Sequence, residues 1–287
     1  MILEQFFSTF RDFIDAIPGV DTASSFKSLE SYARMAKKQI CDIVTSDIFN
    51  TIASGNNTVL KGELGIALGY LSLYKYSPFS AVNARNAGKD VYKYEYEAMR
   101  NEYIDGYYAA MDSLLELLFT GELKDEWLKT QQASRITTLA IKSCAELNTY
   151  YPIDNSYLFF FRTIPIQEEH LDDSFYSLFE RIKDKQREDL TQKAKRALSQ
   201  MIIATAIQRF DAMELPASIR TIRNLSGDQK FLKHKVPDEY PMDKLAVDLI
   251  ASATDMIRTI DSILENQDTA IDSFDIVNDP EDKIYLV

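Results

Sequence analysis

Apolar residues recur at helical spacing along most of this chain, and this pattern constrains the fold more than any other feature. Four of them fall at offsets 0, 3, 4 and 7, the spacing of one face of an α-helix: Leu64, Ala67, Leu68 and Leu71. The same offsets recur at Met111, Leu114, Leu115 and Leu118. The 287 residues include only nine glycines and eight prolines, too few for the many turns of a β-sandwich or barrel. We therefore expect an all-α protein.

The same periodicity predicts five helices in residues 1–122. The first should end at Pro18-Gly19, and its apolar face consists of Phe6, Phe10, Phe13, Ile14 and Ile17. Ser24 and Ser25 are candidate N-caps of a short second helix. A short third helix should carry Ile40, Val44, Ile48 and Ile52. Ser77-Pro78 should end the fourth helix, residues 79–90 should form a polar loop, and Gly121 should end a long fifth helix.

Part of the sequence returns further along the chain. The segment SDIFNTI, residues 46–52, is matched by YSLFERI at residues 176–182, a shift of 130 positions. The apolar faces of the other four helices have counterparts in the same order, at shifts between 130 and 142. Any two amphipathic helices can be slid into register, but a series of shifts that grows where loops intervene is typical of a tandem duplication. We expect two roughly five-helix bundle units, residues 1–122 and 123–266, followed by an extended C-terminal tail, residues 267–287.

Charge and hydropathy limit the classes of partner. The net charge is −12, and such an acidic chain is poorly suited to grip nucleic acid, although it could surround DNA without holding it. No apolar run is long enough to span a membrane, and the first residues lack the basic start and cleavage site of a signal peptide. Cys41 and Cys144 both occupy apolar positions of helical patterns. We therefore expect a soluble, unexported protein with two buried thiols.

Motifs for catalysis or cofactor binding are absent from the sequence. The two histidines, His170 and His234, have no ligands at metal-site spacing, and Glu168-Glu169-His170 is at most half of a carboxylate site. Neither a glycine-rich phosphate-binding motif nor a nucleophile elbow occurs. Three glycines of the fourth helix should instead allow close helix packing: Gly62, Gly65 and Gly69. The sequence predicts no enzyme, no cofactor and no bound metal.

Two segments have the composition of interaction surfaces. Five apolar residues stand in succession at Tyr157–Phe161, which predicts either core burial on several sides or a subunit contact. The sequence KIYLV at 283–287 is apolar and strand-favouring, so we expect it to dock on its own domain or on a partner. The candidate interface residues are Ile284, Tyr285, Leu286, Val287, Phe79, Val82, Phe159 and Phe161.

The layout resembles that of a known protein family. A serine precedes each aromatic short helix, in SSFKSL and NSYLFFF, and the next short helix of each half contains IF or LF. A long apolar helix, a proline and a last helix then follow. This order is similar to that of the head-to-tail connector proteins of tailed bacteriophages. The second half opens with Glu126-Trp127 and carries YYPIDNS, which resembles the duplicated connectors of phages that infect Bacteroidetes, crAss-like phages included. The resemblance covers residues 1 to about 265.

The resemblance implies a structural virion protein without catalytic residues. Its subunits would form an adaptor ring between the portal and the tail, commonly a dodecamer, with DNA passing through the lumen and no sequence-specific binding. Residues 79–90 and 213–240, together with the tail, would contact neighbouring proteins, and the portal and tail proteins would be partners. A soluble bacterial helical module that binds another protein through an exposed groove is the alternative. Self-assembly distinguishes the two.

Overall fold

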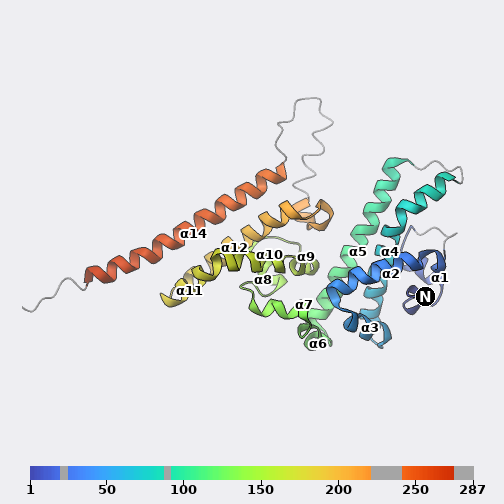
Figure 1. Ribbon diagram of the computed structural model, residues 1–287, viewed down its shortest axis with the longest axis horizontal. Coiled ribbons are helices and arrows are strands. Elements are labelled where there is room, and N and C mark those ends of the chain that lie inside the picture. Colours follow the sequence, from blue (N-terminus) through green and yellow to red (C-terminus); the bar gives the residue numbers. More distant parts are fainter. Residues whose placement is uncertain (20–24, 87–91, 221–240, 275–287) are drawn as a thin grey trace, which may run out of the picture. The chain divides into compact units, whose positions relative to one another are not determined.

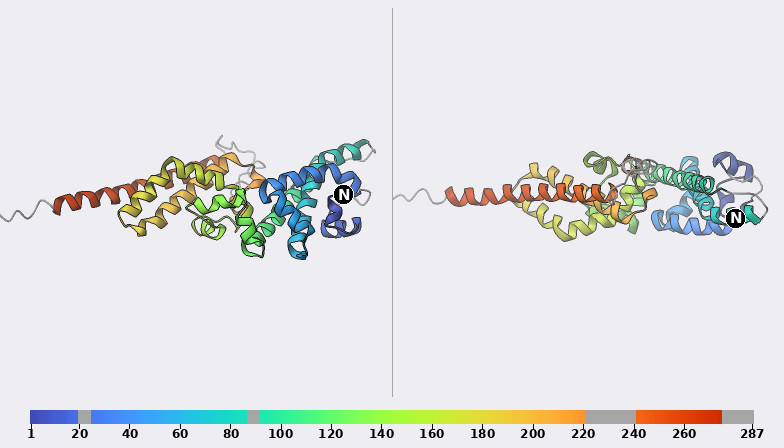
Figure 2. Two further views of the ribbon diagram at one scale, coloured as in Figure 1. Left: turned by 60° about the horizontal axis from the view of Figure 1, so that its bottom comes forward. Right: turned by 90° about the horizontal axis from the view of Figure 1, so that it is seen from above.

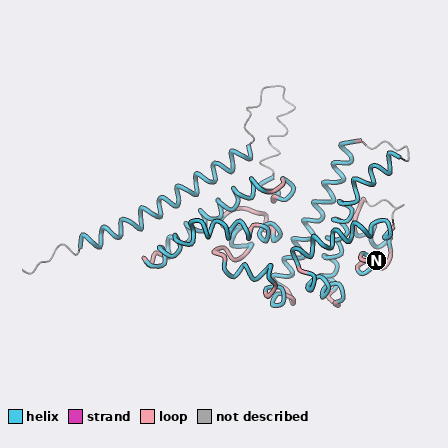
Figure 3. The backbone as a smooth tube through the Cα atoms, viewed as in Figure 1, coloured by secondary structure: helices cyan, strands magenta, loops and turns pink. Residues whose placement is uncertain are grey.

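The computed structural model describes residues 1–19, 25–86, 92–220 and 241–274, and every regular element among them is helical (Figures 1 and 3). The all-α prediction is confirmed. None of the described helices is both long enough and apolar enough to cross a membrane. The candidate residues Ile284, Tyr285, Leu286 and Val287 lie outside the described residues, as do positions 221–240 of the second predicted contact segment.

The described helices form two compact units. Unit 1 comprises residues 1–138, 155–162 and 212–216, and unit 2 comprises residues 139–154, 163–211, 217–220 and 241–274. Unit 1 contains η1 (Leu3–Gln5), α1 (Phe10–Ala16), α2 (Phe26–Val44), α3 (Ser46–Ser54), α4 (Thr58–Asn86), α5 (Lys93–Thr120), α6 (Lys124–Leu128), α7 (Gln131–Ser134), η2 (Arg135–Thr138), α9 (Tyr157–Arg162) and η4 (Ala212–Glu214). Unit 2 contains α8 (Cys144–Tyr150), α10 (Ile164–His170), the π-helix η3 (Leu171–Phe175), α11 (Tyr176–Asp184), α12 (Glu188–Arg209) and α14 (Pro241–Phe274).

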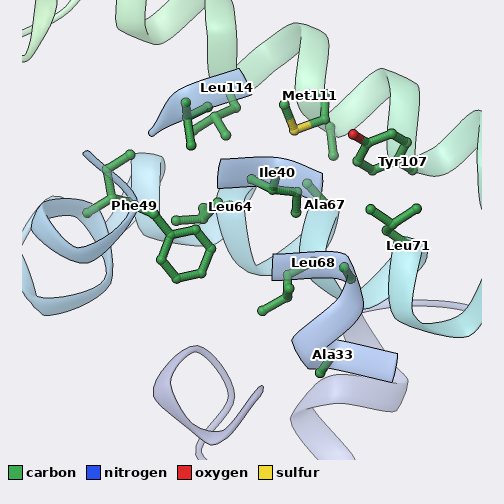
Figure 4. Close-up of a cluster of buried hydrophobic side chains, with 14 of the residues drawn as sticks. Ala33, Ile40, Phe49, Leu64, Ala67, Leu68, Leu71, Tyr107, Met111 and Leu114 are labelled. Carbon is green, nitrogen blue, oxygen red and sulfur yellow. The ribbon is translucent and has the colours of Figure 1, made fainter. Parts of the chain in front are cut away.

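The core of unit 1 lies where α4 packs along α5 and where α2 packs on α4. The faces predicted from periodicity meet there: Leu64 and Leu68 of α4 and Met111 and Leu114 of α5 are fully buried (Figure 4). Ile40 of α2 is buried in the same cluster. Helix packing of amphipathic faces thus supplies most of the driving force for this unit.

Helix α2 is longer than the sequence pattern predicts. Ser25 is its N-cap, as expected, and its side-chain oxygen accepts a hydrogen bond from the amide of Ser28 at 3.4 Å. The predicted break before Ile40 is wrong, because α2 continues to Val44. The break comes at Thr45, whose φ of 71° takes the backbone out of the helical region before α3 begins.

The first predicted helix is shorter than expected. The face from Phe6 to Ile17 is divided between the turn η1 and helix α1, so a single helix through Phe6 is wrong. Thr9 starts α1 with a capping box: its hydroxyl accepts from the amide of Asp12 at 3.1 Å, and the Asp12 carboxylate accepts from the amide of Thr9 at 2.9 Å. This reciprocal pair fixes the start of α1 after Phe6.

Helix α4 continues through the proline that was predicted to end it. A proline within a helix has no amide to donate to the carbonyl four residues earlier, which for Pro78 is that of Tyr74. The hydroxyl of Ser77 donates to this carbonyl at 2.8 Å and replaces the missing bond. The predicted polar loop at 79–90 is therefore wrong for residues 79–86, which are helical.

Unit 2 is built around the pair α12 and α14. Leu198 and Ile202 of α12 are fully buried, as are Ala253 and Ile260 of α14. The buried Gln167 of α10 binds both backbone groups of Ile141: its Oε1 accepts from the amide at 2.7 Å and its Nε2 donates to the carbonyl at 3.2 Å. This amide bridge holds the segment before α8 against α10.

The segment before α8 departs from the predicted pattern. The shift of 130 positions places the counterpart of the Phe6–Ile17 face at Ile136, Ala140, Ser143, Cys144 and Leu147, which predicts one helix there. In the structure, α8 begins only at Cys144, after its N-cap Ser143, and Ile136 lies in the short helix η2. The Ser143 hydroxyl accepts from the amide of Glu146 at 3.1 Å. The prediction of one continuous helix is wrong, because this cap starts a new one.

The tandem duplication remains a prediction. Helices α3 and α11 both span nine residues, and Ser25 before α2 corresponds in sequence to Ser156 before α9. However, α9 belongs to unit 1, so the compact units do not coincide with the predicted repeats 1–122 and 123–266. The predicted repeats are defined by similarity of sequence, whereas the compact units are defined by which residues pack together.

Two of the three predicted packing glycines of α4 lie in close contact with another segment, and the third does not. A methyl group at Gly65 would lie 2.9 Å from Cβ of Phe6. One at Gly69 would lie 2.8 Å from Cε2 of Phe13 and still closer to Ile17. Nothing lies within 4 Å of the same position at Gly62. The predicted packing role therefore applies to Gly65 and Gly69.

Adding one methyl group at two sites of α4 should have opposite effects. Gly69→Ala should lower the free energy of unfolding by about 1–3 kcal/mol, because Phe13 and Ile17 must move. Gly62→Ala, the matched control, should raise it by up to about 1 kcal/mol, because alanine favours the helix and the space is open. Urea unfolding followed by circular dichroism measures both. Equal changes would show that α4 is not closely packed at Gly69.

Candidate interaction surface

Exposed aromatic residues gather at one end of the α4–α5 pair in unit 1. Phe79 and Val82 of α4 are 55% and 54% exposed, and Tyr92 and Tyr94 at the start of α5 are 58% and 68% exposed. These four residues, together with Tyr32 of α2, are called the aromatic surface below. Phe79, Val82, Tyr92 and Tyr94 are four of the nine large hydrophobic residues that are exposed in the described part of the chain, and Tyr32 is half-buried. The other five are distributed over different elements.

Ring contacts hold the aromatic surface in place. Tyr32 packs on Phe79, with ring centroids 5.5 Å apart, and on Tyr76 at 5.2 Å. Tyr92 and Tyr94 stack at 5.8 Å. Aromatic side chains that are already ordered lose little conformational entropy when a partner binds. The surface is thus prepared for a contact before that contact forms.

Charged side chains border these rings. Lys93 is highly exposed and pairs loosely with Glu97 at 3.6 Å. Glu95 accepts a hydrogen bond from the hydroxyl of Tyr94 at 3.3 Å. In sequence, residues 75–100 contain five basic and three acidic residues, a net charge of +2 within a chain of net charge −12. An apolar centre with a charged rim is typical of protein–protein interfaces.

The structure separates the candidate interface residues. Phe79 and Val82 are exposed, as a contact residue must be, but they belong to helix α4 and not to a loop. Phe159 is only 2% exposed in unit 1 and offers no surface to a partner. Phe161 is half-buried, with its ring 5.6 Å from that of Trp127. Core burial therefore describes the run Tyr157–Phe161 better than a subunit contact does.

Tyr92 and Tyr94 were missed as candidates. The signal was present in the sequence YKYEYE at 92–97, where three tyrosines alternate with charged residues. Residues two positions apart cannot share one face of a helix, so at least one of these rings must point away from the core. Helical periodicity indicates buried faces, and exposed aromatic residues do not contribute to it.

The aromatic run 157–161 is positioned by a carboxylate on another helix. Asp112 of α5 accepts a hydrogen bond from the amide of Leu158 at 2.7 Å and from the hydroxyl of Ser156 at 2.9 Å. It thereby caps the start of α9. Burial raises the pKa of Asp112, and the two hydrogen bonds to its oxygens oppose this effect.

The other end of α9 is held by an ion pair. Arg162 contacts Glu214 of η4 at 2.6 Å, and both side chains are largely shielded from solvent. Burial beside this pair raises the pKa of the Tyr107 and Tyr108 phenols. Both tyrosines therefore stay protonated at neutral pH. These polar contacts secure a segment of chain and do not place a nucleophile next to a base.

The remaining sites considered from the sequence carry structural contacts. Glu169 forms a two-pronged ion pair with Arg209 at 2.6 and 2.7 Å, while Nε2 of His170 lies 2.9 Å from the hydroxyl of Thr205. Burial lowers the pKa of His170. No cluster of three potential metal ligands is found among the described residues. Cys144 is buried, whereas Cys41 is only half-buried and burial raises the pKa of its thiol.

The chain matches no protein-family model, no curated protein and no solved structure in comparisons with known proteins. The case for a functional site therefore depends on the geometry of the chain itself. Within the described residues, the aromatic surface is the one cluster of exposed apolar side chains with a charged rim.

Replacing Asp112 should separate the role of its oxygen from that of its charge. Because the pKa of Asp112 is raised on folding, protonation of its carboxyl stabilises the folded state. This contribution is complete below the unfolded-state pKa, about 3.9. This contribution is lost as the pH rises through the folded-state value. Asp112→Asn keeps an acceptor for Leu158 and carries no charge. It should therefore raise the free energy of unfolding at pH 7 and lose that advantage in acid.

Asp112→Ala is the matched comparison. It leaves the amide of Leu158 and the hydroxyl of Ser156 without their acceptor, which should cost about 1–3 kcal/mol at pH 7. Urea unfolding of both variants and the parent chain at pH 7 and in mild acid measures these differences. If asparagine destabilised the fold as much as alanine does at pH 7, the negative charge itself would be what holds α9.

Proposed function

We propose that this chain is a structural assembly protein, the subunit of an adaptor ring between the portal and the tail of a tailed bacteriophage. The observation that carries the proposal is the aromatic surface, which leaves Phe79, Val82, Tyr92 and Tyr94 more than half exposed in the isolated chain. Burying one such side chain contributes roughly 1.5–3 kcal/mol, so several together support a specific contact. The sequence resemblance to head-to-tail connectors supplies the class of assembly.

A ring requires that one surface of a subunit meets a different surface of the next. Contacts of this kind close into a ring when the rotation between subunits divides a full turn. The aromatic surface lies at one end of a helix pair, so it is suited to meet a different face of a neighbour. We expect a dodecamer in the virion, with the portal protein on one side and tail proteins on the other.

The charge of the chain supports a channel for DNA. With a net charge of −12, a ring of these subunits would repel phosphates on average and would not arrest passing DNA. We expect DNA in the lumen to make no sequence-specific contacts. Neither an enzymatic activity nor a cofactor forms part of the proposal.

The aromatic surface also favours a second candidate function. A bacterial helical module that binds another protein would use the same exposed rings, since tyrosines are enriched where binding energy is concentrated. Such a module has no need to bind itself. The measurement that distinguishes the two functions is therefore the mass of the particles that the chain forms.

The chain should assemble, alone or when portal protein is added. Light scattering coupled to size-exclusion chromatography should give a whole multiple of 32.9 kDa, the mass of one chain. Phe79→Ser combined with Tyr94→Ser should reduce assembly, because it removes two exposed rings from the surface. Val59→Ser should not, although Val59 is 59% exposed on the same helix. A strict monomer under both conditions would contradict the ring.

Removal of residues 279–287 should weaken assembly and leave the helical fold intact. The segment contributes the apolar residues Ile284–Val287, which we expect to bind a neighbouring protein. Circular dichroism should show unchanged helicity per residue, while the fraction of assembled chain falls. Unchanged assembly after this deletion would show that the segment takes no part in it.

A further inference from the structure

We infer that the aromatic surface is the docking site for residues 275–287 of a second copy of the chain. The inference rests on the proposed assembly and names the contact that joins neighbouring subunits. It assigns the site to Phe79, Val82, Tyr92 and Tyr94 on one copy. The occupant is the segment DIVNDPEDKIYLV on the other.

The composition of the two partners supports the contact. Residues 275–287 contain four acidic residues and one lysine, and six of the thirteen residues are apolar aliphatic or aromatic. The aromatic surface offers exposed rings beside Lys93, whose side chain is 86% exposed and 3.6 Å from Glu97, while Glu95 accepts a hydrogen bond from the Tyr94 hydroxyl. It lies in the stretch 75–100, which carries a net positive charge within an acidic chain. Opposite charges steer such a contact, and the apolar residues give it stability.

The arm that presents the segment points outward from its own unit. Residues 275–287 directly follow α14, a helix of 34 residues and therefore about 50 Å long. Figure 2 shows that α14 continues beyond α11, its neighbour in unit 2, in both views. The buried side chains described on α14 run from Ala246 to Leu264, and Glu265 and Asn266, which follow them, are exposed. A helix that is packed on its unit up to Leu264 and continues to Phe274 suits an arm that reaches another molecule.

The aromatic surface is also the best site within the described residues for such a segment. The other exposed large apolar residues include Met35 on α2, Val59 at the start of α4, Tyr176 on α11 and Val247 on α14. Met35, Tyr176 and Val247 are each the single such residue described on their helix, and Val59 lies twenty residues before Phe79 on α4. A segment that ends in four consecutive apolar residues needs several exposed apolar contacts close together. Phe79 and Val82 near the end of α4 and the stacked Tyr92 and Tyr94 at the start of α5 supply two such pairs.

Photo-crosslinking between isotopically different copies tests the contact directly. A photoreactive benzoylphenylalanine replaces Tyr285 in the full chain, and ¹⁵N-labelled and unlabelled copies are mixed before irradiation. We expect crosslinks from position 285 to the end of α4 or the start of α5, found between heavy and light copies. Crosslinks only within heavy or within light chains, or only to other elements, would overturn the inference.

Charge reversal provides a second readout. Lys93→Glu should lower the crosslinking yield about threefold or more, because it places a like charge beside the acidic segment. Asp279→Lys with Asp282→Lys in the same chain should restore it. Lys124→Glu is the matched control, since Lys124 and Lys93 are both exposed first residues of a helix. A yield unaffected by Lys93→Glu, or equally lowered by the control, would count against the site.

The mass measurement keeps this inference separate from the proposed function. If the chain forms rings but position 285 crosslinks elsewhere, the ring stands and the docking site is wrong. If copies crosslink at the aromatic surface in an open chain of subunits or a dimer, the docking site stands and the adaptor ring is wrong.

Discussion

The close approach of helices in unit 1 depends on three positions where no side chain is present. Gly65 and Gly69 admit the rings of Phe6 and Phe13 against α4. Between α4 and α5, a methyl group at Gly106 would lie 2.6 Å from the ring of Tyr70. These contacts set the spacing of α4 relative to α1 and α5 and therefore fix where the far ends of both long helices lie. The aromatic surface is formed at those ends.

The second requirement for this surface is that α4 does not stop at its proline. If the helix ended at Ser77, as the sequence suggested, Phe79 and Val82 would belong to a connecting loop. The Ser77 hydroxyl donates to the Tyr74 carbonyl, which removes the cost of one unsatisfied backbone group. The helix then continues through Pro78, and the ring of Phe79, two residues past Ser77, packs on that of Tyr32. The Ser77 hydroxyl thus supports the continued helix that carries Phe79 and Val82.

The helical periodicity of the sequence predicted the buried faces of the helices. It did not predict the helix boundaries that a single residue determines. The buried faces of α4 and α5 were predicted because every fourth or third residue repeats the signal. The break at Thr45 was not, because a threonine at positive φ is rare and has no sequence signature. The site was half predicted: Phe79 and Val82 were named, whereas Tyr92 and Tyr94 were not. The cap from Asp112 to α9 joins residues 46 positions apart, which no local pattern can reveal.

The cap from Asp112 to α9 helps to explain why a duplicated sequence would pack as two units that differ from its two repeats. In the first half, residues 26–44 form one continuous helix, whereas the corresponding residues 157–175 are divided into α9, α10 and a π-helix. Pro165 lies in the first turn of α10, where proline favours a new helix start. Asp112 and the Arg162–Glu214 pair then bind α9 at both ends within unit 1. If the halves share an origin, this break is where the second copy diverged, because it releases one turn of helix to complete the core of the first.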